Sequence, residues 1–175
     1  LHGKAGNTPA SLVEVEVADS APYEIRIRGL VKESTFKKAD LQTLTELRYV
    51  PGSNSFSLHD VLTNHADYPH DYQIIYHSNF GTPILEEGAR FLAPMSSISP
   101  FNDYAKSGLK TWQTYQGPTK DFDEMVFNIQ PLADENHQTL AAVVNKAGDK
   151  GASIQFDTRQ LPVLTLWKNT DTVKQ

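Results

Sequence analysis

The sequence has no cysteine, little positive charge and no long apolar run, and each absence removes a class of function. Without cysteine among its 175 residues, the chain has no disulfide, no thiolate metal ligand and no cysteine nucleophile. This composition suits a reducing cytosol, so we expect a cytoplasmic protein. No apolar run approaches the roughly 18 residues that span a bilayer, so we expect no membrane segment. The net charge of −5 argues against binding to a nucleic-acid backbone.

The common signatures of catalytic and metal sites are also absent from the sequence. It contains no glycine-rich phosphate loop, no GxSxG and no HExxH. The stretch "NHADYPHD" places His65 and His70 near Asp67 and Asp71, but without the spacing of ligands on one helical face. We therefore expect no metal site and interpret this stretch as a solvated loop.

The pattern that does recur is alternation of apolar and polar residues, which is typical of half-buried strands. It is clearest in "SLVEVEV" and "YEIRIRG", which the loop "ADSAP" connects. An antiparallel hairpin would set Glu14 beside Arg28 and Glu16 beside Arg26. Such cross-strand pairs contribute roughly 0.2–1 kcal/mol each.

Further strands are predicted along most of the chain, with little sign of helix. The candidate stretches are residues 41–50, 55–64, 71–79, 89–98, 124–132, 138–146, 152–159 and 162–169. Residues 97–123 form the one long irregular stretch, a kind of segment that often carries function. About ten short strands predict an all-β antiparallel sandwich or barrel, here as a single domain over residues 1–175.

His77 is the most conspicuous candidate for a functional side chain. In "YQIIYHSN" it shares one face of the predicted strand with Gln73, Ile75 and Asn79, a mixture that suits the floor of a polar cleft. A hydrogen-bonded structural histidine is the alternative. His2, in "LHGKAGN", is open to both a functional role and that of a flexible terminus.

Aromatic and acidic residues in the second half suggest a sugar site. Trp112, in the long irregular stretch, would serve either as a platform for a sugar ring or as a lid over the core. The cluster "KDFDEMVF" offers Asp123 and Glu124, either as cleft carboxylates or as ordinary surface charge. Trp167 and Lys168 end a strand that begins at a proline.

Four blocks, in order along the chain, resemble the aldose 1-epimerase (galactose mutarotase-like) superfamily. They are "LHGKAGNTPA", "YHSNFGTPILEEGARFLAP", "TWQTYQGPTKDFDEMVF" and "FDTRQLPVLTLWKN", and they are most similar to a divergent bacterial branch of mostly uncharacterised proteins. The resemblance implies an antiparallel β-supersandwich, here incomplete. It also implies an isomerase of carbohydrate metabolism that interconverts the anomers of a small-molecule sugar by acid–base ring opening, without metal or organic cofactor.

The resemblance also assigns roles to individual residues. His77 matches the family's general acid, and His2 matches a histidine that holds the ring oxygen or a neighbouring hydroxyl. Glu124, or Asp123 if the alignment shifts by one residue, would bind sugar hydroxyls.

Three further residues complete the expected sugar site. We expect Asn79, Lys168 and Trp112 to contact the sugar. With His77, His2 and Glu124 they form the set of site residues that the sequence predicts.

The general-base glutamate of the family lies in a Gly-x-Glu-Pro-like segment, and the sequence reaches Gln175 before any such segment. We therefore expect the chain to be the C-terminal portion of a longer protein, lacking the base, so that its own activity is an open question. A non-catalytic sugar-binding module and an accessory β-sandwich domain are the alternatives. The sequence favours no oligomeric state.

Overall fold

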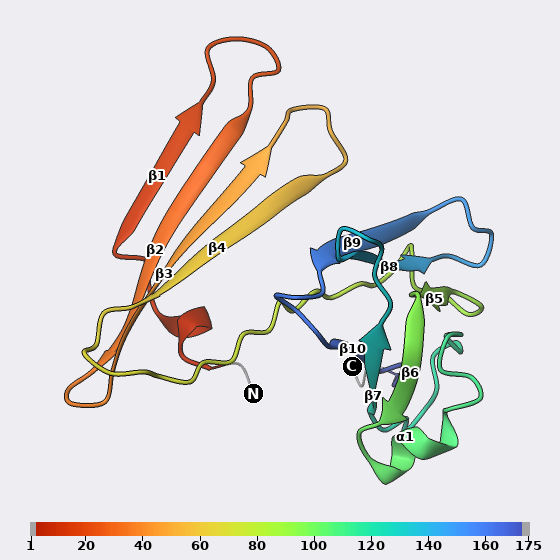
Figure 1. Cartoon of the computed structure of the whole chain (residues 1–175). Helices are drawn as coiled ribbons and strands as arrows, with labels where there is room; N and C mark the ends of the chain where they lie inside the picture. Colours follow the sequence, from red (N-terminus) through yellow and green to blue (C-terminus); the bar gives the residue numbers. More distant parts are fainter. Residues whose placement is uncertain (1–2, 173–175) are drawn as a thin grey trace. The chain divides into compact units, whose positions relative to one another are not determined.

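The computed structural model describes residues 3–172, and its regular secondary structure is almost entirely antiparallel strand, which confirms the all-β fold class (Figure 1). The chain divides into two compact units, unit 1 (Leu1–His77) and unit 2 (Ser78–Gln175). Each unit is described separately below. The expectation of one domain over residues 1–175 stays a prediction.

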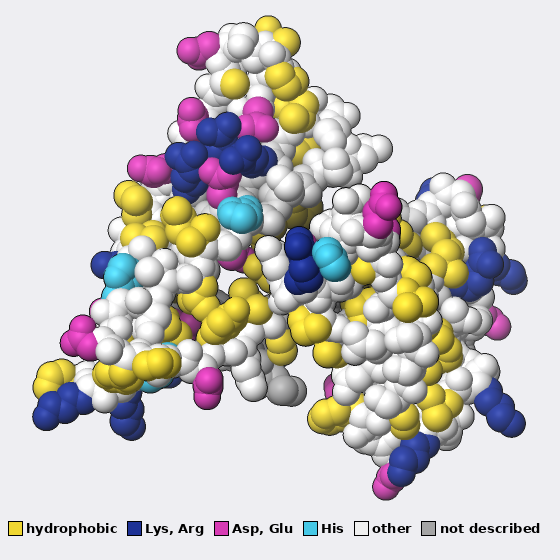
Figure 2. Space-filling view, viewed as in Figure 1, with side chains coloured by type: hydrophobic (Ala, Val, Ile, Leu, Met, Phe, Trp, Pro, Cys, Tyr) yellow, Lys and Arg dark blue, Asp and Glu magenta, His cyan; other side chains and the backbone are white. Residues whose placement is uncertain are grey.

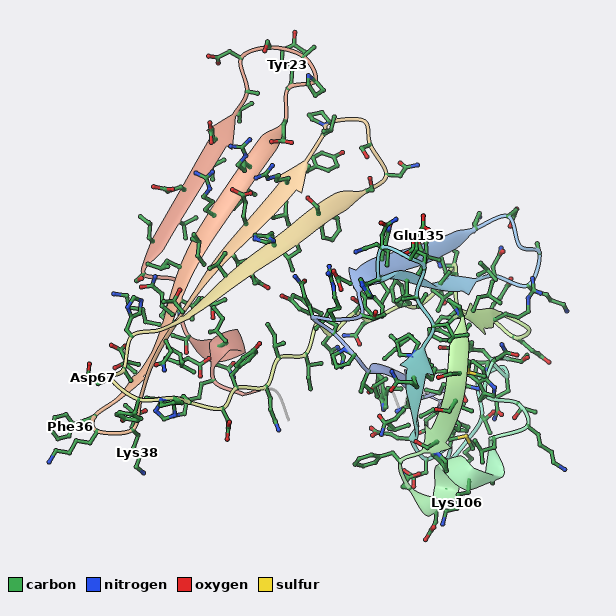
Figure 3. The ribbon with its side chains drawn as sticks, viewed as in Figure 1. Tyr23, Phe36, Lys38, Asp67, Lys106 and Glu135 are labelled. Atoms are coloured by element: carbon green, nitrogen blue, oxygen red, sulfur yellow. The ribbon has the colours of Figure 1, made fainter. Side chains whose placement is uncertain are left out.

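Unit 1 is a meander in which each strand pairs with the next along the chain. Its sheet, here called sheet A, has the order β1-β2-β3-β4, and all its pairs are antiparallel. The elements are the 3-10 helix η1 (Ala5–Asn7) and the strands β1 (Leu12–Val17), β2 (Ile25–Thr35), β3 (Ala39–Tyr49) and β4 (Phe56–Asn64). Figure 3 shows Tyr23 at the turn after β1, and Phe36 and Lys38 at the opposite end of the sheet.

Because the residues of sheet A alternate in strict register, its charged pairs lie on one face, and two rows of apolar residues lie on the other, here called the apolar face. Glu14 pairs with Arg28 and Glu16 with Arg26, which confirms the predicted hairpin. The side chains of Lys, Arg, Asp and Glu gather together over this part of the sheet (Figure 2).

The apolar face carries two apolar rows that cross all four strands. The rows are Val17–Ile25–Tyr49–Phe56 and Val15–Ile27–Leu47–Leu58. Val15 is 64% exposed and Phe56 68% exposed. An antiparallel sheet usually buries its apolar face, so the exposure of this face is unusual.

Unit 2 contains two three-stranded antiparallel sheets and one short helix. Sheet C has the order β10-β7-β6, and sheet B has the order β5-β8-β9. The elements are β5 (Arg90–Leu92), β6 (Met95–Pro100), α1 (Asp103–Ser107), β7 (Met125–Pro131), β8 (Gln138–Val144), β9 (Gly151–Asp157) and β10 (Leu164–Lys168). Asn102 caps α1 by accepting a hydrogen bond from the Ala105 amide at 2.8 Å.

The core of unit 2 lies between these two sheets. Phe127, Ile129 and Leu166 of sheet C form one buried cluster with Phe91 and Val143 of sheet B. Unit 2 is therefore a small β-sandwich, as the predicted sandwich architecture requires.

Three boundaries differ from the predictions. Residues 71–79 are not a strand, because alternation alone gives no ladder without a partner strand, and none pairs with them in the described part of the chain. Residues 89–98 contain all of β5 and the start of β6, which are separated at Pro94, a residue with no amide to donate to a ladder. The long stretch 97–123, predicted to be irregular, includes most of β6 and the helix α1.

Candidate functional site

His77 is the last residue of unit 1 and lies, exposed, in the irregular segment that follows β4. The residue takes part in an interaction within the chain. The residue before it, Tyr76, donates a hydrogen bond from its hydroxyl to the Asp60 carboxylate on β4. The structure thus places the histidine in a segment that is hydrogen-bonded to sheet A through Tyr76, and not at the end of a strand.

The other residues predicted around His77 fall in different places. Asn79 is exposed and lies near the start of unit 2. His2 lies outside the described residues, so its predicted role stays a prediction.

Lys168, predicted to contact a sugar, is buried at the end of β10 with only 5% of its surface exposed. Its Nζ donates to the backbone carbonyls of Thr111, Trp112 and Thr114 at 3.2, 3.2 and 2.8 Å. The ammonium also lies 5.1 Å from the centre of the Tyr115 ring, and burial lowers the pKa of Lys168 to about 8. Because an ammonium has three N–H donors, contact with a sugar would require one of these bonds to be exchanged.

Trp112 is a core residue rather than an exposed platform. It is 7% exposed and meets Phe91 edge to face, with ring centroids 6.1 Å apart. Of the two interpretations made from the sequence, the structure favours the lid over the core. Period-2 alternation could not settle this, because Trp112 lies in a stretch without regular secondary structure.

Trp167, the other tryptophan, faces outward. In β7 and β10, the pairs Phe127–Leu166 and Ile129–Leu164 point into the core, so the intervening pairs Val126–Trp167 and Asn128–Thr165 point away from it. Trp167 is 43% exposed. On the same face, the Thr165 hydroxyl donates a hydrogen bond to Asn128 Oδ1 at 3.1 Å. We call Trp167, Val126, Asn128 and Thr165 the outer face of sheet C.

Glu124 lies at the edge of this outer face. It is exposed and directly precedes β7, whose first residue, Met125, pairs with Lys168. The structure therefore brings three predicted residues, Glu124, Lys168 and Trp112, to the same end of sheet C. The sequence could have pointed to Trp167 rather than Trp112 as the exposed tryptophan. In β10, Leu164, Leu166 and Lys168 alternate with Thr165 and Trp167, so the leucines and Trp167 face opposite sides of the strand.

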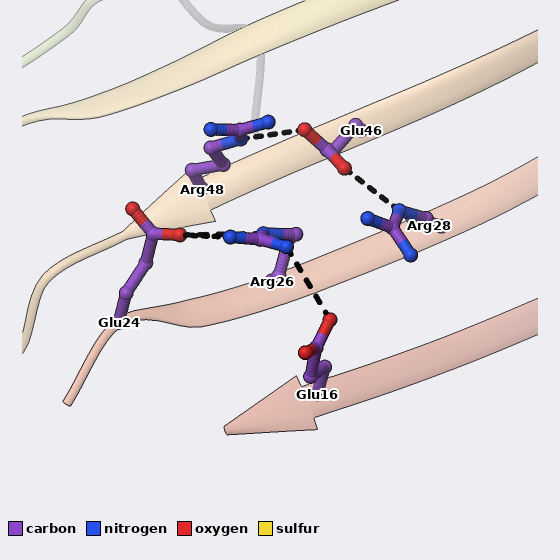
Figure 4. A network of polar contacts seen from close by, with 6 residues as sticks. All are labelled: Glu16, Glu24, Arg26, Arg28, Glu46 and Arg48. Atoms are coloured by element: carbon purple, nitrogen blue, oxygen red, sulfur yellow. Dashed lines mark hydrogen bonds and ion pairs between the residues drawn. The ribbon is translucent and has the colours of Figure 1, made fainter. Parts of the chain in front are cut away.

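Sheet A carries a second polar cluster, in which charges of opposite sign are joined (Figure 4). Arg26 bonds Glu24 at 2.8 Å and Glu16 at 3.5 Å, and Glu46 accepts from Arg28 at 2.7 Å and from Arg48 at 2.5 Å. Hydrogen bonds from the two arginines lower the pKa of Glu46. With its carboxylates paired in this way, the cluster resembles a solvated structural face more than a catalytic centre.

The described residues contain no group of three or more His, Cys, Asp or Glu side chains that could hold a metal ion. No helix among residues 3–172 is long and apolar enough to cross a membrane.

Comparison with known proteins gives one family and one similar structure. The family described as "Domain of unknown function (DUF4432)" matches residues 1–175. The chain is 99% identical to a protein from Klebsiella pneumoniae subsp. pneumoniae MGH 78578, described as a "putative aldose 1-epimerase" and solved by crystallography at 1.90 Å, with a TM-score of 0.98. The match covers 100% of this chain and 46% of that chain, so this chain spans less than half the length of its relative. No curated protein matches. These findings confirm the resemblance to the aldose 1-epimerase superfamily.

Proposed function

Because this chain belongs to the DUF4432 family along its whole length, and is nearly identical to part of a protein described as an epimerase, we propose that it contributes a sugar-binding face to an aldose 1-epimerase-like protein. A protein of the length of the Klebsiella pneumoniae relative, of which this chain spans 46%, is called the longer protein below. It would interconvert the anomers of a free sugar by opening and reclosing the sugar ring. The ligand is a small-molecule carbohydrate.

The outer face of sheet C is the observation that carries this proposal. Trp167 offers a flat, exposed aromatic surface on which the C–H groups of a sugar ring can pack. Asn128 and Thr165, two positions along the same face, supply amide and hydroxyl groups for sugar hydroxyls. Glu124 directly precedes β7. If the strand alternation extends back by this one residue, Glu124 lies on the outer face of sheet C, where its carboxylate can accept hydrogen bonds from sugar hydroxyls.

In the proposed reaction, a base removes the proton from the anomeric hydroxyl while an acid protonates the ring oxygen. The C1–O bond to the ring oxygen breaks, the aldehyde rotates about C1–C2, and the reverse proton transfers close the ring on the other face. We assign the acid to His77 and a stabilising contact at the ring oxygen to His2. The base is supplied elsewhere in the longer protein.

The remaining predicted contact residues, Asn79, Lys168 and Trp112, differ in how accessible they are to a sugar. Asn79 is exposed and available to a ligand. Lys168 would act on the sugar only after giving up a carbonyl partner, so we propose that it chiefly holds residues 111–114. Trp167 takes the platform role that the sequence suggested for Trp112.

A non-catalytic sugar-binding module is the second candidate. The outer face of sheet C favours it as much as it favours catalysis, because an aromatic platform with polar neighbours binds a ring without any proton transfer. The two candidates differ in what they require of His77, which only the catalytic one needs.

Binding to the outer face can be tested by saturation-transfer NMR with a panel of free aldoses. Trp167→Ala should weaken binding about fivefold, since ring packing is worth roughly 1 kcal/mol. Leu92→Ala is the matched control, because Leu92 is a similarly exposed apolar residue of unit 2, 41% exposed, that lies in β5 of sheet B rather than in sheet C. Equal binding by the two variants would remove the outer face of sheet C from the site.

A further inference from the structure

The segment that carries His77 has little backbone structure of its own. Residues 71–80 belong to no strand or helix, in contrast to the long hydrogen-bonded ladder of β3 and β4 that precedes them. Earlier in the same connection, side chains fasten the chain to sheet A. Asn64 donates to the Tyr68 carbonyl at 2.7 Å, and the Tyr68 hydroxyl donates to the Lys38 carbonyl at 3.0 Å.

The corresponding attachment next to His77 is the hydrogen bond from Tyr76 to Asp60. Asp60 lies in β4, opposite Thr45, on the face of sheet A that carries the two apolar rows. A carboxylate on such a face is expensive unless it has a partner, and Tyr76 provides one through its hydroxyl. Burial, and then this hydrogen bond, raise the pKa of the Tyr76 phenol, so the hydroxyl stays a donor at neutral pH.

Asp60 also has bonding capacity that Tyr76 does not use. Its second oxygen, Oδ1, is buried and has no hydrogen-bond partner among the described residues. A half-buried carboxylate with one oxygen unpaired adds little to the stability of sheet A. The placement of Asp60 is better explained by the hydrogen bond that its other oxygen, Oδ2, accepts from Tyr76.

We propose that Asp60 is a positioning residue for His77, acting through Tyr76. The carboxylate fixes the tyrosine hydroxyl, the tyrosine side chain fixes its own backbone against β4, and the next residue along that backbone is the histidine. The inference rests on the role assigned to His77 under the proposed function. It extends that role to two residues that do not touch the sugar.

The test uses the histidine itself as the reporter. In Tyr76→Phe and in Asp60→Ala, the C2–H signal of His77 should shift or broaden, because the attachment that orders its backbone is gone. The signal is assigned by its loss in His77→Asn. Asp60→Asn should restore most of the wild-type signal, because an amide oxygen still accepts from Tyr76.

Tyr23→Phe is the matched control, because Tyr23 is another tyrosine of unit 1, 55% exposed, that lies in the loop between β1 and β2 rather than beside His77. It should leave the His77 signal unchanged. A His77 signal equally unaffected in Tyr76→Phe would overturn the proposal, and so would a shift of the same size in both phenylalanine variants.

Activity gives a second and separable readout in the longer protein. Tyr76→Phe should lower kcat about 10²-fold with little change in KM, since a displaced catalytic group loses rate rather than affinity. If no protein accelerates anomer exchange, the proposed function fails, while the His77 signal still decides the positioning of the histidine. If exchange is catalysed and Tyr76→Phe has the wild-type kcat, Asp60 has no positioning role.

Discussion

Lys168 carries its ammonium group into unit 2, where three backbone carbonyls and the face of Tyr115 surround it. A buried ammonium is tolerated only when its donors are satisfied, and this one joins the end of β10 to residues 111–114. The backbone beside Trp112 is held by this contact. At the scale of single residues, the Lys168 side chain, which the sequence suggested for sugar binding, therefore stabilises the fold of unit 2.

Replacing Lys168 with Met should destabilise unit 2 by about 1–3 kcal/mol at pH 7, because three carbonyls lose their donor. The pH dependence provides a sharper test. Burial lowers the pKa of Lys168 from 10.5 to about 8, so the unfolded chain binds more protons between these values. Stability from this group therefore rises with pH from about 8 to 10.5 and is constant below.

Thermal unfolding of Lys168→Met and wild type across this range checks the prediction, with exposed Lys110→Met as the control. The difference in stability between Lys168→Met and wild type should change with pH above about 8, and the difference between Lys110→Met and wild type should not. A constant difference for Lys168→Met would show that Lys168 keeps an ordinary pKa.

At the scale of elements, the alternation of residues predicted most strands because the register of an antiparallel ladder repeats every two residues. Glu14, Arg28, Glu16 and Arg26 pair as expected for this reason. Residues 71–79 show the same alternation but have no partner strand among the described residues. A local sequence pattern cannot show whether a partner strand is present. For Trp112 the sequence left both the sugar platform and the core lid open, because its stretch has no period from which the direction of the side chain can be inferred.

The apolar face of sheet A gives a prediction at this scale. Val15 and Glu14 are neighbours on β1 that point to opposite faces, and Val15 is 64% exposed. Val15→Ser should lower the fluorescence of a bound hydrophobic dye such as ANS, whereas Glu14→Ser should not. Stability should change by less than about 0.5 kcal/mol in both variants, because neither side chain is buried. Equal dye binding by the two variants would mean that the apolar face does not take up the dye.

At the scale of the whole molecule, the fold class and the superfamily were predictable from the sequence, whereas the geometry of the site was only partly so. His77, Glu124 and Asn79 are exposed, as a ligand requires, but Lys168 and Trp112 are buried. Burial depends on how two sheets pack, which single-strand patterns do not encode. The contact between Asp60 on β4 and Tyr76 in the irregular segment could not be predicted either, because it depends on how that segment folds back against the sheet.

The most direct test of the account is the rate of exchange between α- and β-anomers of free aldoses, measured by NMR for this chain and for the longer protein. We predict that the longer protein accelerates exchange, and that His77→Asn removes most of this acceleration, a loss of order 10²–10⁴, while leaving thermal stability nearly unchanged because His77 is exposed. Exchange no faster than in buffer across the whole panel, or full activity in His77→Asn, would contradict the account.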